Sequence, residues 1–275
     1  MSKMISKKIL KIPIINKFIF FFLEMQDSLD TLHSRIDVSD ELFNKFQNDR
    51  RSERYLEVFK KKEPLVSVCI ATYNRAELLV DRCLNSIFAQ DYDNFEVIVV
   101  GDCCSDNSEK LIKQIGDERL HFHNLPERGN YPADPDRCWM VAGTTPINKA
   151  LEFSQGDFIT HLDDDDEYMP DRISKLVQFT QQKKLDFIWH PFWHELPNGK
   201  WKLITSHHFR KTEVTTSSSF YHKWLKIIPW DINAYKYNEP GDWNRFRKLK
   251  YIGLKMARFP KPLLKHYKER NQHSL

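Results

Sequence analysis

Five consecutive acidic residues, Asp163 to Glu167, are the feature of this 275-residue chain that most directly suggests chemistry. Carboxylates this close repel one another unless a cation or solvent lies between them. They directly follow an apolar stretch, residues 158–162, that is expected to be a buried strand. Divalent Mg²⁺ and Mn²⁺ prefer oxygen ligands, often one or two carboxylates together with substrate phosphates. We therefore expect a divalent cation here, and the alternative is a solvated acidic loop ahead of the helix that Pro170 begins.

Two more polar turns follow apolar stretches. Residues 65–71 (LVSVCIA) lead into Thr72-Tyr73-Asn74-Arg75, and residues 95–100 (FEVIVV) lead into Gly101-Asp102. These stretches, and residues 120–124, predict strands, and helical spacing of apolar residues lies between them. The order strand, helix, strand predicts a parallel, doubly wound α/β sheet. Ligands of such sheets bind at the carboxyl ends of strands, where both turns and the acidic run fall.

The second half of the chain carries fewer signals. Residues 126–145 contain several glycines and prolines and are expected to form a long functional loop. A helix over residues 147–153 and a buried strand over residues 186–190 are expected on either side of the acidic run. Asn198-Gly199 separates two apolar segments, which predicts a β-hairpin.

The first 63 residues differ in character from the rest and predict a helical extension. Ile14, Ile15, Phe18, Ile19 and Phe22 share one helical face, and lysines at 7, 8 and 11 precede them. A basic amphipathic helix of this kind can lie in a membrane interface. It can equally pack on the α/β domain or on a second subunit, and the sequence leaves both interpretations open.

Composition excludes some partners. The net charge is only +4, which gives no basic field for nucleic acid. The five cysteines lack metal-site spacing, and their odd number suits a reducing compartment, so a cytoplasmic location is expected, with possible contact at the inner face of the membrane.

Three segments taken in order resemble family 2 glycosyltransferases: PLVSVCIATYNRAELLVDRCLNSIFAQDY, then FEVIVVGDCCSDNS, then GDFITHLDDDDEYMPDRI. The match extends through about residues 64–180 and more loosely beyond. It implies a glycosyltransferase-A fold, with a Rossmann-like, mixed but mostly parallel sheet. Residues 64–275 would then form the catalytic domain, with a nucleotide-sugar and metal half (64–180) and an acceptor half (181–275).

The resemblance assigns donor contacts by position. Thr72, Tyr73, Asn74 and Arg75 match the first nucleotide-contacting loop, with Tyr73 along the base and Arg75 toward the diphosphate. Asp102 matches the acid that hydrogen-bonds the base, although this chain has Gly-Asp-Cys-Cys where the family usually has Asp-Asp-Gly-Ser. Asn148 matches an asparagine that faces the donor. Asn74 is also an ordinary helix-capping candidate, and Asn148 could be a plain exposed helix residue.

The same resemblance assigns the cation site and the base. Asp163-Asp164-Asp165 match the Asp-x-Asp motif, in which Asp165 binds Mn²⁺ or Mg²⁺, Asp164 lies near the ribose and Asp163 participates from further out. His266 matches a C-terminal metal ligand of some relatives. Asp242 matches the general base, with Glu239 as the substitute candidate, and the alternative for Asp242 is a helix N-cap.

The implied reaction is inverting transfer of a sugar from a nucleoside-diphosphate donor, a UDP-sugar by preference, to a carbohydrate or lipid-linked acceptor. An aromatic wall is expected on the acceptor side, formed by Trp193, Trp201, Phe220, Tyr221, Trp224 and Trp230. A sugar nucleotidyltransferase would need a glycine-rich phosphate loop after the first strand, which residues 71–77 lack. A non-catalytic scaffold protein with the same fold remains the alternative from a different class.

Overall fold

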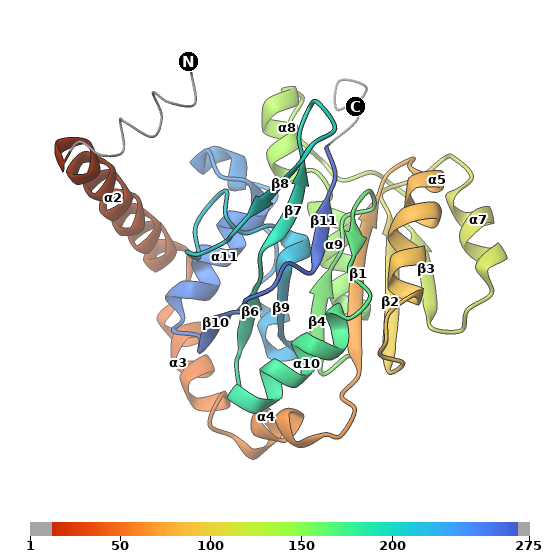
Figure 1. The fold of residues 1–275 in the computed structure, drawn as a ribbon, viewed down its shortest axis with the longest axis horizontal. Coiled ribbons are helices and arrows are strands. Elements are labelled where there is room, and N and C mark those ends of the chain that lie inside the picture. Colours follow the sequence, from red (N-terminus) through yellow and green to blue (C-terminus); the bar gives the residue numbers. More distant parts are fainter. Residues whose placement is uncertain (1–12, 269–275) are drawn as a thin grey trace.

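A seven-stranded sheet runs through the centre of the computed structural model, which describes residues 13–268 (Figure 1). Its strand order is β10-β6-β9-β4-β1-β2-β3. Neighbouring strands are parallel except for β9, which is antiparallel to both β4 and β6. The mixed, mostly parallel sheet confirms the expected fold class. The strands are β1 (Val66–Thr72), β2 (Phe95–Gly101), β3 (Leu120–Asn124), β4 (Phe158–His161), β6 (Phe187–Trp189), β9 (Ser219–His222) and β10 (Met256–Arg258).

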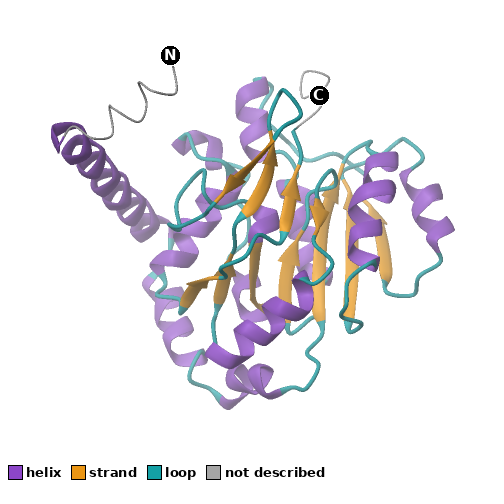
Figure 2. Ribbon diagram, in the orientation of Figure 1, coloured by secondary structure: helices purple, strands orange, loops and turns teal. Residues whose placement is uncertain are grey.

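The central strands read as apolar runs because helices cover both faces of the sheet (Figure 2). Every residue of β2 is buried, and β1 has one partly exposed residue. Helices connect β1 to β2 and β2 to β3, as expected from the sequence. The covering elements are α5 (Ala76–Leu78), the π-helical turn η2 (Leu79–Leu84), α6 (Asn85–Phe88), α7 (Ser108–Ile115), α9 (Thr144–Phe153), α10 (Arg172–Lys183) and α11 (Gly241–Tyr251).

The loop expected over residues 126–145 contains a helix. Helix α8 (Pro135–Val141) begins after Asp134, whose carboxylate accepts a 2.9 Å hydrogen bond from the Arg137 amide. An aspartate followed by proline is a signal for the start of a helix, so this helix was predictable from the sequence. The many glycines and prolines around it favoured the prediction of a loop instead.

A second, four-stranded sheet has the order β5-β11-β7-β8. The expected hairpin is confirmed as β7 (Phe192–Glu195) and β8 (Trp201–Ile204), with Gly199 in the left-handed conformation at its turn. Strand β11 (Leu264–His266) lies between β7 and the two-residue strand β5 (Glu167–Tyr168). The C-terminal region therefore lies beside the acidic run, since β5 starts at the last acid of that run.

The N-terminal extension is helical and contains α2 (Pro13–Asp37), α3 (Asp40–Asp49), α4 (Glu53–Glu57) and the 3₁₀ helix η1 (Val58–Lys60). Three further 3₁₀ helices lie in the C-terminal part of the chain: η3 (Thr216–Ser218), η4 (Lys223–Ile227) and η5 (Ala234–Tyr237). Phe46 and Tyr55 are buried in the same core as the central sheet. The Tyr55 hydroxyl donates to the Asp186 carboxylate at 2.7 Å. The segment from α3 onward therefore packs as part of the α/β body, whereas the N-terminal part of α2 projects away from it (Figure 1).

No helix within residues 13–268 combines the length and the apolar character that crossing a bilayer requires. The lysines at 7, 8 and 11, on which the membrane interpretation partly rests, lie outside the described residues.

Replacing Phe46 by alanine tests whether α3 belongs to the core of the α/β body. Its side chain has no exposed surface, so Phe46→Ala should lower the free energy of unfolding by about 3–5 kcal/mol. Phe20→Ala on α2, where the side chain is exposed, should change it by about 0.5 kcal/mol or less. Denaturant titration followed by near-UV circular dichroism measures both. Equal effects would mean that α3 folds apart from the sheet.

Candidate functional site

A cavity of about 680 Å³ opens at the carboxyl ends of β1, β2 and β4. It brings together nine of the residues singled out from the sequence, namely Thr72, Tyr73, Arg75, Asp102, Asp163, Asp164, Asp165, Asp242 and His266. Residues separated by up to 194 positions thus share one site, as the strand-end argument requires.

Asn74 and Asn148 are not among the residues that line the cavity. The Asn74 side-chain oxygen accepts a 2.9 Å hydrogen bond from the Ser105 amide, which ties the loop after β1 to the loop after β2. The Asn148 amide is bonded to the backbone of Trp230 at both ends, at 3.0 and 2.8 Å. Both asparagines therefore fix the walls of the site, and the expected donor contacts have no support from their placement.

Arg75 and Thr72 hold two of the acids. The Thr72 hydroxyl donates to Asp164 at 2.7 Å, and one Arg75 nitrogen lies 3.0 Å from carboxylate oxygens of both Asp164 and Asp165. Burial, together with the neighbouring carboxylates of Asp164 and Asp166, nevertheless raises the pKa of Asp165 to about 7. The site therefore carries more negative charge than Arg75 alone neutralises.

The run turns on itself so that its first and fourth acids face the same way. The Asp166 amide donates to the Asp163 carbonyl at 3.0 Å, the bond of a β-turn. Asp163, Asp166 and His266 then bring potential ligand atoms within 4.8 Å of one another. The His266 ring nitrogen lies 2.8 Å from the Asp166 carboxylate.

The electrostatics of this trio fit a cation. Burial, reinforced by the charge on Asp166, raises the pKa of Asp163 well above its usual range. Burial alone would lower the pKa of His266, but the charges on Asp166, Asp163 and Asp165 raise it to about 10. The carboxylates of this trio thus favour a positive charge beside them, and two carboxylates with one imidazole suit Mn²⁺ once the imidazole has released its proton.

The group of potential ligands in the structure differs in one member from the set expected from the sequence. Asp163 and His266 lie together as anticipated, but the third member within the described residues is Asp166, while the Asp165 carboxylate is paired with Arg75. The spacing of three between Asp163 and Asp166 could have suggested it, because residues i and i+3 of a turn approach each other.

The side of the cavity that holds Tyr73 and Asp102 includes residues that the sequence analysis did not single out. Asp102 is buried, and one of its oxygens accepts a 3.0 Å hydrogen bond from the Gly129 amide. The Arg128 guanidinium lies 3.9 Å from the centre of the Tyr73 ring. Arg128 and Tyr131 both line the cavity and come from the long loop. Arg128, which stacks on Tyr73, and Tyr131 therefore form the cavity wall beside Tyr73 and Asp102, in the loop that follows β3.

Asp242 faces the cavity from the first turn of α11. One oxygen accepts a 2.6 Å hydrogen bond from the Trp243 amide, and burial raises the pKa of Asp242 to about 6. Glu239, the substitute candidate, is buried elsewhere, with its carboxylate bonded to Arg247 at 2.9 Å and Asn244 at 2.8 Å. Of the two acids, only Asp242 is positioned to meet a molecule in the cavity.

The expected aromatic wall is largely wrong. Of its six members only Trp230 lines the cavity. Phe220 and Tyr221 are fully buried because they belong to β9, and Trp224 packs on Phe46 with rings 4.9 Å apart. Besides Tyr73 and Tyr131, the aromatic residues that line the cavity are Trp139, Phe192, Trp230 and Trp243. His194 also lines the cavity, and its ring is stacked on that of His266 with the ring centres 5.2 Å apart.

Comparison with known proteins identifies the family. The sequence profile of glycosyl transferase family 2 matches residues 67–133 and 144–238, more than half of the chain. The chain belongs to glycosyl transferase family 2. The matched segments contain every cavity residue predicted from the sequence except Asp242 and His266.

One curated relative in this family is a GalNAc(5)-diNAcBac-PP-undecaprenol beta-1,3-glucosyltransferase of Campylobacter jejuni, 33% identical over 118 residues, which are 42% of this chain and 34% of the relative. The alignments with curated relatives cover between 25% and 59% of those proteins' own lengths.

Solved structures share the glycosyltransferase-A fold. S. aureus TarS in complex with UDP-GlcNAc superposes with a TM-score of 0.58 at 19% identity, over 76% of this chain and 61% of that chain. The mannosyltransferase PcManGT of Pyrobaculum calidifontis, in complex with GDP-Man and Mn²⁺, gives 0.52 at 15% identity, over 78% and 62%.

The cation trio predicts which acid matters most for metal affinity. Asp166→Asn removes a carboxylate from the trio and should weaken Mn²⁺ binding by about tenfold or more. Asp165→Asn should weaken it less, because that carboxylate is paired with Arg75. Asp171→Asn, a partly exposed acid nearby in sequence, is the control and should leave binding unchanged. Calorimetric titration with Mn²⁺ measures all three. A larger loss in Asp165→Asn than in Asp166→Asn would restore the ligand set expected from the sequence.

Proposed function

We propose that this chain transfers a sugar, with inversion, from a nucleoside-diphosphate donor to a hydroxyl of a glycan or lipid-linked acceptor. The observation that carries the proposal is a single cavity lined by Tyr73 and Asp102, by two members of the Asp163, Asp166 and His266 trio, and by the partly buried Asp242 carboxylate with its raised pKa. Each part has a role in such a transfer, and the family membership agrees with it.

A UDP-sugar is the favoured donor. Tyr73 and Arg128 form a stacked pair that suits the flat face of a base, and Asp102 presents a carboxylate oxygen for its N–H groups. UDP-GlcNAc is the ligand named for the TarS structure, which supports a uridine donor, while the mannosyltransferase structure holds GDP-Man.

Asp163, Asp166 and His266 are the residues that would hold Mn²⁺ or Mg²⁺. A bound divalent cation would neutralise the negative charge that develops on the departing diphosphate. The diphosphate would also compete with Asp164 and Asp165 for the Arg75 guanidinium, which lies at the cavity wall. Mn²⁺ in the mannosyltransferase structure supports this part of the proposal.

Asp242 is the proposed general base. Its ionised carboxylate would accept the proton of the acceptor hydroxyl as that oxygen attacks the anomeric carbon, and the donor C–O bond to the diphosphate breaks. A single displacement of this kind inverts the anomeric centre. A pKa of about 6 leaves most of the carboxylate ionised at neutral pH and keeps it basic enough to accept a proton.

The acceptor is proposed to be a sugar hydroxyl on a glycan or a lipid-linked glycan. The Campylobacter relative is named for an undecaprenol-diphosphate-linked acceptor, which supports the lipid-linked form. Trp139, Phe192, Trp230 and Trp243 offer apolar faces for a sugar ring. All five cysteines are free thiols, which is compatible with the cytoplasmic side of a membrane.

Nucleotide binding provides the first test. Calorimetric titration of UDP and GDP, with and without Mn²⁺, should give metal-dependent binding that prefers UDP. Asp102→Ala should weaken UDP binding about tenfold, since a hydrogen bond to a charged group contributes about 1.5–3 kcal/mol. Glu109→Ala, an exposed acid on α7, is the matched control. Absence of binding by any nucleotide under any metal condition would contradict the transferase proposal and favour a scaffold protein.

The role of Asp242 predicts a pH profile. Because the base form exists above a pKa of about 6, kcat/KM should rise about tenfold per pH unit below pH 6 and level off above it. Asp242→Asn should lower kcat about 10²- to 10⁴-fold and abolish this limb, with UDP affinity nearly unchanged. Glu239→Gln, outside the cavity, should keep the limb. A limb that survives in Asp242→Asn would assign the base elsewhere.

A further inference from the structure

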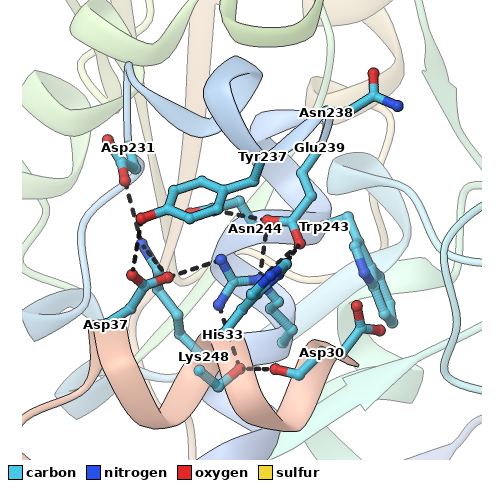
Figure 3. Close-up of polar contacts among 12 residues, drawn as sticks. Asp30, His33, Asp37, Asp231, Tyr237, Asn238, Glu239, Trp243, Asn244 and Lys248 are labelled. Carbon is cyan, nitrogen blue, oxygen red and sulfur yellow. Dashed lines mark hydrogen bonds and ion pairs between the residues drawn. The ribbon is translucent and has the colours of Figure 1, made fainter. Parts of the chain in front are cut away.

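Helix α2 docks on the catalytic domain through its polar side (Figure 3). Asp30 and Ser34 are buried against α11, with exposed fractions of 5% and 1%. An Arg247 nitrogen lies 2.7 Å from the Asp37 carboxylate, and another nitrogen of the same guanidinium donates to Glu239 at 2.9 Å. A buried arginine thus connects α2 to the loop that precedes α11.

Further ion pairs fix the rotation of α2 about its axis. Asp27 lies 3.2 Å from Arg210 and 3.5 Å from Lys250. The four inward residues, Asp27, Asp30, Ser34 and Asp37, follow one another at spacings of three and four, so they form one helical stripe. Because this polar stripe faces the protein, the opposite, apolar side of the helix must face outward.

The outward side carries a regular apolar stripe. Its members are Phe18, Phe22, Met25, Leu29, Leu32 and Ile36, whose exposed fractions are 60, 58, 44, 41, 54 and 72%. Their spacing of 4, 3, 4, 3 and 4 residues is that of the a and d positions of a heptad repeat. Six successive positions of a coiled-coil seam are therefore exposed, and an exposed apolar stripe of this length is unusual for a monomeric protein.

From Met25 to Ile36 the stripe is narrow, which distinguishes it from a membrane-lying face, whereas Phe18 to Phe22 are all apolar and exposed. Gln26, Ser28, His33 and Arg35 flank it over its second half, so only a and d positions are apolar there. A helix that lies in a lipid interface usually has a wider apolar face and a polar face rich in Lys and Arg. Here the polar face carries Asp27, Asp30 and Asp37, and these acids are engaged with the protein.

We propose that α2 pairs with α2 of a second copy of this chain, so that the protein is a dimer joined by a two-stranded coiled coil. The uncharged Gln26 and Ser28 beside the seam allow two identical helices to meet without like-charge repulsion. Ile19 and Phe21 fall at flanking positions and add to the interface, while Phe20 lies on the outer side. The ion pairs of Arg247 hold each helix in the rotation that presents its seam.

The mass of the full-length chain tests this pairing. Size-exclusion chromatography with light scattering, at several protein concentrations, should give twice the 32.9 kDa of one chain. The double variant Leu29→Glu, Leu32→Glu should halve that mass, because two charges in each seam oppose two in its partner. Phe20→Glu is the matched control, since it changes an equally exposed apolar residue outside the seam and should keep the doubled mass.

Each other result overturns the pairing. A wild-type mass of one chain would exclude the dimer, and a doubled mass that persists in the double variant would exclude α2 as its seam. Co-sedimentation with vesicles of phosphatidylcholine and phosphatidylglycerol separates the lipid alternative: a single-chain mass, with vesicle binding lost in the double variant, would assign this face to a membrane. Unchanged far-UV circular dichroism confirms that the double variant folds. None of these readings needs a donor, so they stand or fall apart from the transferase proposal.

Discussion

The charge of five adjacent acids at one strand end governs how this site is assembled. Such a cluster is stable only where positive groups and hydrogen-bond donors converge on it. Thr72 and Arg75, from the end of β1, contact Asp164. Arg82, from the following helix, donates to the Asp165 carbonyl at 2.7 Å. The loop after β1 and the first helical segment are therefore held at the same edge as the acids.

The need for hydrogen-bond donors and positive groups beside the acids also explains the position of the C-terminal strand β11. Besides the contact of His266, the Tyr267 amide donates to Asp166 at 3.0 Å, and Lys265 and the Tyr267 hydroxyl bond to Glu167 at 2.9 and 2.8 Å. The Arg82 guanidinium covers the Tyr267 ring at 3.6 Å from its centre. The loop after β1 and the C-terminal strand β11 thus meet over the acids, and the second sheet brings an imidazole to them.

The features that the sequence predicted correctly are those that depend on residues close together in the chain. The apolar runs of β1 and β2 specify buried strands, and strand ends specify where polar turns gather, so nine of the eleven site residues named from the sequence do line the cavity. What escaped prediction depends on distant partners. Asn148 bonds to Trp230, Asp165 is paired with Arg75, and Phe220 belongs to an unanticipated strand. The orientation of α2 likewise follows from Arg247, more than 200 residues away, although its apolar periodicity was visible from the start.

The position of β11 has a consequence for biosynthesis. Asp166 and its partner His266 are separated by 100 residues. At a synthesis rate of about 5–20 residues per second, the acids leave the ribosome about 5–20 seconds before the imidazole does. During that interval the nascent chain has the carboxylates of the cation site but lacks β11, which covers them. The nascent domain is therefore expected to keep this edge open, and accessible to chaperones, until β11 has been synthesised and inserted between β5 and β7.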